Sequence, residues 1–196
     1  RDKGLRIEPI FGDNGPWDLI CYSDSDYAGD PDSRQSVSGF ILYVKGVPIS
    51  WRPKAQQSVT LSSSEAEWVA LSEAVKEIMF VLQLLENMKI KVKLPVTVRV
   101  DNVGATFMSK NISTSNRTKH VDIRTKYVNE YVEDGIIKII FVQSGDNDSD
   151  IMTKNVSGDL LDKHAVKLIG GQNGLKIVCR GETPPLPDER ALGHRD

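Results

Sequence analysis

The stretch Cys21-Tyr22-Ser23-Asp24-Ser25-Asp26-Tyr27-Ala28-Gly29-Asp30 decides how the rest of the chain is interpreted. The apolar run 19–22 predicts a buried strand that ends at Asp24, and the turn-forming residues 29–32 predict a loop behind it. A carboxylate at the end of a strand is a candidate for chemistry, but Asp is also a common turn residue that hydrogen-bonds nearby backbone. The catalytic interpretation of Asp24 therefore depends on whether other acids reach the same place.

The composition is that of an ordinary globular protein. The 196 residues are 39% hydrophobic and 27% charged, and the formal net charge is −2. This balance excludes nucleic-acid binding through bulk positive charge, so any such contact must use a local patch. No apolar run approaches the roughly 18 residues that a transmembrane helix needs, so we expect no membrane partner. Cys21 and Cys179 lack metal-ligand spacing, which favours a reducing compartment, and a start at Arg1 suggests a piece of a longer protein.

The chain is expected to form one main domain. We expect a lead-in over residues 1–17, a domain over residues 18–170, and a flexible tail over residues 171–196, where glycine, proline and charge accumulate. Strands are predicted over residues 17–24, 39–44, 47–51, 95–101 and 136–142, with a linker over 52–57 and a short β-rich run over 58–61. Helices are predicted from Ser62 through Leu85, after Asn102 through Met108, over 117–134, and from Asp150 to Leu168 with a break near Gly158.

The order of these elements predicts which strands are neighbours. Lys45-Gly46 is typical of a tight hairpin, so the first three strands should form an antiparallel meander. Strands separated by a helix usually pair in parallel through a right-handed crossover, so the strand over 95–101 should lie beside the first strand. Asp24 and Asp101, each at the end of its strand, would then be adjacent.

The long helix carries two glutamates near its start. Ser62-Ser63-Ser64-Glu65 has the form of a capping box, which gives Glu65 a structural role. At about 100° per residue, Glu67 falls inside the apolar stripe that contains Leu71. Because an ionised carboxylate on a buried face is costly unless it is paired or bound to metal, Glu67 is the stronger candidate for chemistry. A fourth acid, Asp150, precedes the last predicted helix.

Seven motifs, in unbroken order, resemble the ribonuclease H domain of copia-type LTR-retrotransposon Pol polyproteins. They are YSDSDYAGD at 22–30, SGF at 38–40, ISW at 49–51, LSSSEAEW at 61–68, VDN at 100–102, RTKHVD at 117–122 and DIMTK at 150–154. The resemblance covers roughly residues 19–168. It implies an α/β, ribonuclease H-like fold: a five-stranded mixed sheet with the order 3-2-1-4-5, flanked by helices.

The same resemblance implies four catalytic and metal-binding acids, which are Asp24, Glu67, Asp101 and Asp150. The family pattern of Glu, two bulky residues and Ala fits residues 67–70, and so it selects the same glutamate as the helix-face argument. Oxygen-only ligands suit Mg²⁺, with Mn²⁺ as a substitute. Two such ions about 3.5 to 4 Å apart can activate a water and stabilise the leaving oxygen of an in-line displacement.

The resemblance also implies an activity and its context. The implied reaction is hydrolysis of the RNA strand of RNA/DNA hybrids by a metal-dependent endonuclease during retrotransposon reverse transcription. The implied partners are the hybrid and the reverse transcriptase domain of the same polyprotein. The implied location is cytoplasmic, in the virus-like particle of a retrotransposon.

Candidate substrate contacts are weaker. Arg117, His120 and Arg124 share one face of the predicted 117–134 helix and could meet phosphates, but an ordinary solvated charged face is the favoured interpretation of such a run. Ser25 and Asn102 are further weak candidates. Recognition of a hybrid would rest on backbone shape and 2′-hydroxyls rather than on base sequence.

Two other functions stay open. A catalytically silent ribonuclease H-like interaction module of a polyprotein could keep the same fold. A transposase or integrase of the same superfamily is disfavoured, because its Asp-Asp-Glu order puts the Glu last, whereas Glu67 lies between Asp24 and Asp101.

Individual residues also have alternative interpretations. A calcium loop that starts at Asp24 is disfavoured, because its twelfth position is Gln35 rather than the bidentate Glu. Some ribonucleases H have a His in the loop before the last Asp, and residues 143–149 contain none. Trp51 and Trp68 are predicted to be core aromatics rather than platforms for base stacking.

Overall fold

The computed structural model describes residues 15–30, 32–57, 60–102 and 119–170. The strands are β1 (Leu19–Asp26), β2 (Val37–Val44), β3 (Val47–Ala55), β4 (Val96–Val100) and β5 (Ile137–Phe141). The helices are α1 (Ser63–Asn87), α3 (Lys119–Glu133), α4 (Asp150–Thr153) and α5 (Gly158–Gly170), with a 3-10 turn, η1 (Ser144–Asp146). The short helix predicted after Asn102 and the predicted tail lie outside the described residues.

The five strands form one mixed sheet with the order β3-β2-β1-β4-β5, as predicted. β1 pairs antiparallel with β2, and β2 pairs antiparallel with β3. The turn between β2 and β3 has positive φ at Lys45 and Gly46, which is the backbone that a two-residue hairpin requires. β4 pairs in parallel with both β1 and β5, so the long crossover through α1 returns the chain to the centre of the sheet.

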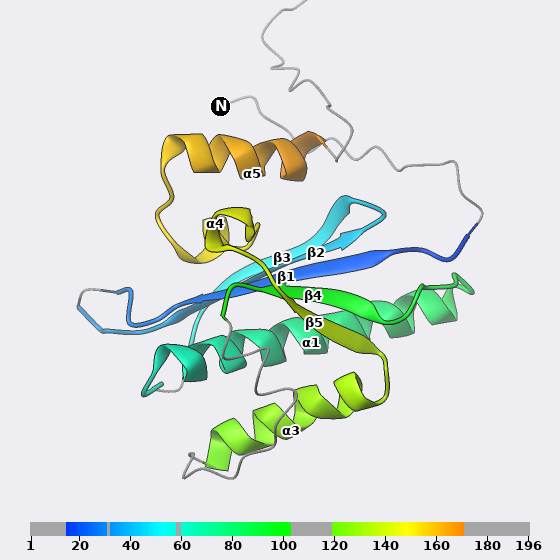
Figure 1. Cartoon of the computed structure of the whole chain (residues 1–196), viewed down its shortest axis with the longest axis horizontal. Coiled ribbons are helices and arrows are strands. Elements are labelled where there is room, and N and C mark those ends of the chain that lie inside the picture. The colour runs from blue at the N-terminus through cyan, green and yellow to red at the C-terminus, as the bar shows by residue number, and fades with distance from the viewer. Residues whose placement is uncertain (1–14, 31, 58–59, 103–118, 171–196) are drawn as a thin grey trace, which may run out of the picture.

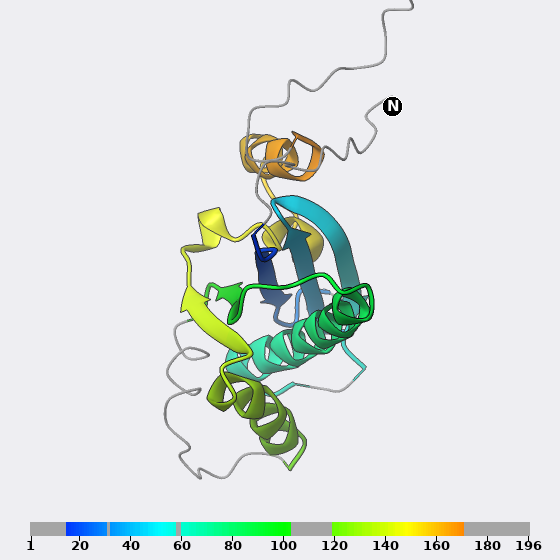
Figure 2. The same cartoon turned by 90° about the vertical axis from the view of Figure 1, so that its right-hand side faces the viewer.

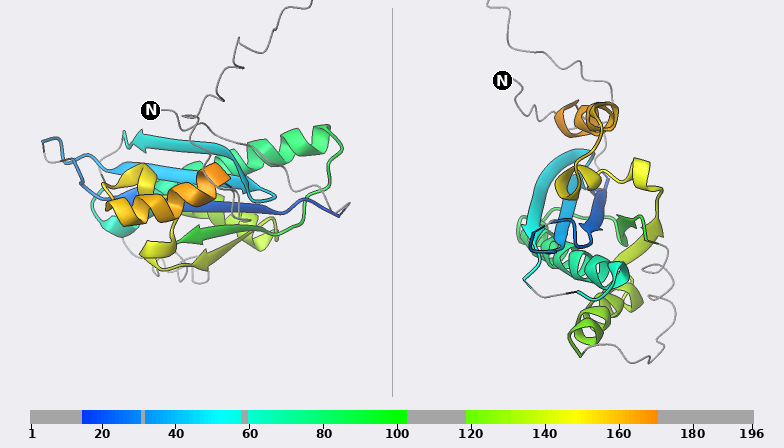
Figure 3. Two further views of the ribbon diagram at one scale, coloured as in Figure 1. Left: turned by 90° about the horizontal axis from the view of Figure 1, so that it is seen from above. Right: turned by 90° about the vertical axis from the view of Figure 1, so that its left-hand side faces the viewer.

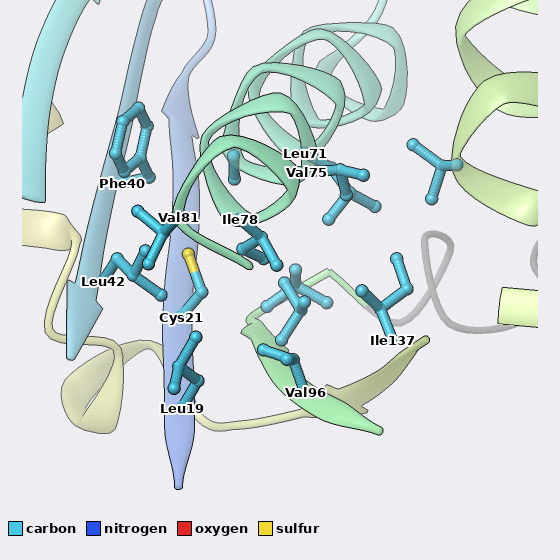
Figure 4. Close-up of a cluster of buried hydrophobic side chains, with 14 of the residues drawn as sticks. Leu19, Cys21, Phe40, Leu42, Leu71, Val75, Ile78, Val81, Val96 and Ile137 are labelled. Atoms are coloured by element: carbon cyan, nitrogen blue, oxygen red, sulfur yellow. The ribbon is translucent and has the colours of Figure 1, made fainter. Parts of the chain in front are cut away.

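Helices cover both faces of the sheet. α1 packs on one face, with α3 against it, while α4 and α5 lie on the opposite face (Figures 1, 2 and 3). The main core lies between α1 and the sheet, where residues such as Leu42, Leu71 and Ile78 are fully enclosed (Figure 4). A smaller cluster around Tyr22 and Ile41 lies under α4 and α5.

Three sequence predictions need correction. β1 does not end at Asp24 but continues to Asp26, because residues 24–26 pair with β2. The predicted linker over 52–57 is mostly strand, since β3 continues to Ala55. β3 is an edge strand, where Pro53 is tolerated. Trp51 is not a core aromatic: it is 46% exposed on that edge strand, whereas Trp68 is buried as predicted.

The start of α1 carries the predicted cap. Ser62 is the N-cap, and its Oγ accepts a hydrogen bond of 3.2 Å from the Glu65 amide. The Glu65 carboxylate accepts a hydrogen bond of 2.7 Å from the amide of Leu61, one residue before the position of the usual capping box. Glu65 is therefore engaged at the helix start.

None of the described helices is long and apolar enough to cross a membrane.

Candidate active site

Three of the four predicted acids meet near the carboxyl ends of two inner strands of the sheet, β1 and β4. One carboxylate oxygen from each of Asp24, Glu67 and Asp101 lies within 4.8 Å of the other two. The parallel pairing aligns Ser23 of β1 with Val100 of β4, so the aspartates that follow them stand at the same level. Glu67 reaches them from the first turns of α1, on the buried face that the periodicity predicts.

Asp150, on α4, lies outside this group of three and is connected with it through Lys154. The Nζ atom of Lys154 lies 3.0 Å from Oδ1 of Asp24, 3.3 Å from Oδ1 of Asp150 and 3.8 Å from Oδ2 of Asp101. A single ammonium thus contacts acids from β1, from the end of β4 and from α4. Glu65 is not among the grouped carboxylates, in agreement with its role in the helix cap.

The cluster is shielded from water. Asp24 is fully buried, Glu67 is 7% exposed, Asp150 is buried, and the side chain of Asp101 is 9% exposed. Burial, followed by the charges of Asp24 and Asp101, raises the pKa of Glu67 to about 8. Burial and the charge of Asp24 raise the pKa of Asp150 to about 6. Without a bound cation, the site therefore resists carrying its full negative charge.

Hydrogen bonds hold both oxygens of Asp24. Oδ2 accepts a hydrogen bond from the hydroxyl of Thr153, and Oδ1 accepts one from the ammonium of Lys154. Burial nevertheless outweighs these two contacts and raises the pKa of Asp24. The orientation of this carboxylate is therefore set by α4 and the residue that follows it.

The donor set fits a hard divalent cation. Oε1 of Glu67 accepts a hydrogen bond of 3.3 Å from the Ser25 amide, while Oε2 is buried and has no hydrogen-bond partner within the described residues. A buried carboxylate oxygen without a donor is costly, and a metal ion would satisfy it. The neighbouring carboxylates of Asp24 and Asp101 supply the further oxygen ligands that Mg²⁺ and Mn²⁺ prefer.

The close packing of α4 on β2 depends on Gly39, for which the sequence analysis predicts no role. A Cβ atom at Gly39 would lie 2.6 Å from Cγ2 of Thr153 and 2.8 Å from Cβ of Met152, so only glycine allows this approach of β2 and α4. The motif at 38–40 contains this glycine, but no local pattern shows that its partner is more than a hundred residues away.

Ser144 holds another acid of the cluster, because its hydroxyl donates a hydrogen bond of 2.6 Å to Oδ2 of Asp101.

Asn147 fastens the loop before α4 to the central strand. Its Nδ2 donates a hydrogen bond of 3.1 Å to the carbonyl oxygen of Ser23, immediately before Asp24. Its Oδ1 accepts hydrogen bonds from the amide of Ser149, at 3.3 Å, and from the Ser149 hydroxyl, at 2.6 Å. The side chain is fully buried, so these contacts fix where α4 begins.

A second buried polar group connects α5 to the sheet. Oδ2 of Asp148 accepts a hydrogen bond of 3.1 Å from the Tyr43 hydroxyl, and Oδ1 lies 2.8 Å from Nδ1 of His164. All three side chains are buried. The loop before Asp150 thus contains no histidine, as the sequence shows, but a histidine from α5 contacts that loop.

The weaker substrate candidates are dispersed. Nη1 of Arg124 donates hydrogen bonds of 2.8 Å to Oγ of Ser72 and 3.4 Å to Oε1 of Glu73, which connects α3 with α1. It also lines a cavity of about 310 Å³ beside the β2–β3 edge. Ser25 is buried and Asn102 is half-buried, both beside the acidic cluster. Arg117 and the His120 side chain lie outside the described residues.

Two plant proteins are similar in sequence to this chain, although no family model matches it. It is 34% identical over 150 residues to the retrovirus-related Pol polyprotein from transposon RE1 of Arabidopsis thaliana. The aligned region covers 76% of this chain and 10% of that protein. It is 37% identical over 146 residues to the corresponding polyprotein from transposon TNT 1-94 of Nicotiana tabacum. The aligned region covers 74% of this chain and 11% of that protein. The chain thus spans about a tenth of the length of these relatives.

A solved structure shares the fold. LC11-RNase H1, in complex with an RNA/DNA hybrid, superposes with a TM-score of 0.52 over 75% of this chain and 99% of that chain, at 15% sequence identity. The sheet order and the crossover through α1 agree with the fold that the motif series predicts. The chain therefore belongs to the retrovirus-related Pol polyproteins of transposons, within which it forms a domain with the ribonuclease H fold.

Proposed function

We propose that this domain is a metal-dependent endonuclease that hydrolyses the RNA strand of RNA/DNA hybrids during retrotransposon reverse transcription. The observation that carries the proposal is the meeting of Asp24, Glu67 and Asp101 within 4.8 Å, with Asp150 connected to this group through Lys154. The fold of LC11-RNase H1, a protein crystallised with such a hybrid, supports the same substrate class.

The four acids would hold two Mg²⁺ ions, with Mn²⁺ as a substitute. When bound, such ions supply an activated water and stabilise charge on the leaving oxygen. Other residues of the chain keep these ligands in position, since Ser25 holds Glu67, Ser144 holds Asp101, and Thr153 holds Asp24. Because ligands must be ionised and the pKa of Glu67 is raised to about 8, metal binding near neutral pH would release a proton.

The substrate and partners follow from the same proposal. Ser25, Asn102, Arg117, His120 and Arg124 are the candidate contacts to a hybrid. Arg124 already contacts Glu73 of α1, so phosphate binding there would have to compete with that ion pair. The reverse transcriptase domain of the same polyprotein is the proposed partner, and the proposed location is the cytoplasm, in a virus-like particle.

Cleavage of a labelled hybrid in Mg²⁺ tests the proposal. The parent chain should cut the RNA strand, and Asp24→Asn and Glu67→Gln should each lose nearly all cleavage. Glu65→Gln is the matched control, because Glu65 belongs to the helix cap and should retain cleavage. If the parent chain binds the hybrid but does not cut it with Mg²⁺ or Mn²⁺, the silent interaction module is the better description.

A further inference from the structure

Lys154 occupies the position where a cation is most needed in the acidic cluster. Its Nζ is 3.0 Å from Asp24, 3.3 Å from Asp150 and 3.8 Å from Asp101. Within the described residues, these three acids form no other ion pair. The ammonium therefore offsets part of the negative charge of the acids at the ends of β1 and β4.

The three contacts of this ammonium reach acids on separate elements: Asp24 on β1, Asp101 at the end of β4 and Asp150 on α4. Clustered carboxylates repel one another unless a cation lies between them. Lys154 is thus the group that lets Asp24, Asp101 and Asp150 stay close in the metal-free protein.

The same position conflicts with a bound metal ion. The ammonium donates hydrogen bonds to Oδ1 of Asp24 and Oδ1 of Asp150, so it would compete with a metal for carboxylates that are proposed ligands. A divalent ion there would stand within a few ångströms of a positive charge, which is strongly unfavourable in a shielded site. The side chain of Lys154 is 34% exposed and has a flexible four-carbon stem, so it has a route out to solvent.

We propose that Lys154 is a resident counter-ion of the metal-free site, which divalent metal must displace, so that Lys154 sets the metal affinity. The inference rests on the proposed metal-dependent function. In this role Lys154 is a positioning residue: it keeps the acids assembled before metal arrives, and its departure frees the ligand oxygens. Thr153 holds the other oxygen of Asp24.

Metal binding to purified variants of the whole chain tests this role. Lys154→Met should lower the melting temperature in EDTA by several degrees and tighten Mn²⁺ binding in calorimetry on the order of tenfold, because the competing charge is gone. Lys154→Arg should restore the melting temperature in EDTA. Lys163→Met is the matched control: Lys163 is an exposed lysine that pairs with Asp146 and, within the described residues, forms no ion pair with Asp24, Asp101 or Asp150, so its loss should leave Mn²⁺ affinity unchanged.

A measurement on the unmodified chain covers the case in which Lys154→Met does not fold. Lysine acylation followed by mass spectrometry should show Lys154 protected in EDTA and several-fold more reactive in Mg²⁺, with Lys163 unchanged. Unaltered or weaker Mn²⁺ binding by Lys154→Met, or protection of Lys154 that survives in Mg²⁺, would overturn the inference. Failure of the parent chain to bind Mg²⁺ or Mn²⁺ at all would instead refute the proposed function.

Discussion

Gly39 and Thr153 approach so closely that a Cβ atom at position 39 would stand 2.6 Å from Cγ2 of Thr153. Gly39→Ala should push α4 away from β2 and separate Asp150 from Asp24. We expect a loss of about 1–3 kcal/mol in the free energy of unfolding, as for overpacked cores, and at least about tenfold less hybrid cleavage. Gly158→Ala is the control, since its Cβ would meet nothing within 4 Å. Wild-type stability and cleavage in Gly39→Ala would contradict this account of α4.

The raised pKa of Glu67 predicts a pH dependence of the metal-free protein. Its pKa is about 8 in the folded state against an ordinary value of 4.5, so between these pH values the folded state holds more protons than the unfolded state. The free energy of unfolding in EDTA should therefore fall as pH rises through this window. Glu67→Gln should reduce this dependence, leaving the part that the raised pKa values of Asp150 and Asp24 produce, and should be more stable than the parent at pH 9 by a few kcal/mol.

Urea unfolding in EDTA at pH 5, 7 and 9 measures this effect. Glu65→Gln is the control and should follow the slope of the parent, because its carboxylate lies outside the cluster. Mg²⁺ should raise the stability of the parent at pH 9 and have little effect on Glu67→Gln. Parallel pH profiles for the parent and Glu67→Gln would show that Glu67 is not the strained acid.

Asn147 should be essential for the position of the last acid. Asn147→Ala removes the hydrogen bond to the Ser23 carbonyl and the acceptor for Ser149, and leaves buried groups unsatisfied. We expect a loss of about 2–4 kcal/mol in stability and a clear loss of hybrid cleavage. Asn155→Ala, at an exposed position five residues after Asp150, should change neither denaturation nor cleavage. Equal melting temperatures for the two variants would argue against this role.

His164 should keep α5 on the sheet. His164→Ala removes the imidazole partner of the buried Asp148 carboxylate, while Tyr43→Phe removes only one neutral donor and should have the milder effect. Hydrogen exchange should show faster exchange of α5 amides in His164→Ala. The neighbouring variant Asp162→Ala provides the comparison at an exposed position of the same helix. Unchanged protection of α5 would mean that its apolar contacts suffice.

The sheet could be predicted because its signals are local. The β-branched run of β4, the hairpin turn at Lys45-Gly46 and the stripe of α1 each belong to one short segment, and the crossover rule then puts β4 beside β1. The place of β5 in the sheet came from the family resemblance. The choice of Glu67 over Glu65 needed only the helix period and the cost of a buried charge. These features depend on neighbours in the sequence, so one sequence is enough to identify them.

The remainder depended on contacts between distant segments. Residues 24–26 carry turn-like side chains, yet pairing with β2 keeps them in β1, because sheet context overrides local preference. Trp51 was predicted to be buried from its size, but its strand lies at an edge where that face stays open. Gly39, Asn147 and His164 act through partners that no spacing rule connects with them.

The four acids come from β1, α1, the end of β4 and α4, and the last of them arrives after every strand is complete. A polypeptide cut short between Phe141 and Asp150 would contain the whole sheet yet lack the residues of α4 and Lys154. Such a fragment would keep all the paired strands but would lose the fourth acid together with the lysine that contacts three of the four. Truncation at this point would therefore separate the scaffold from the site that it supports.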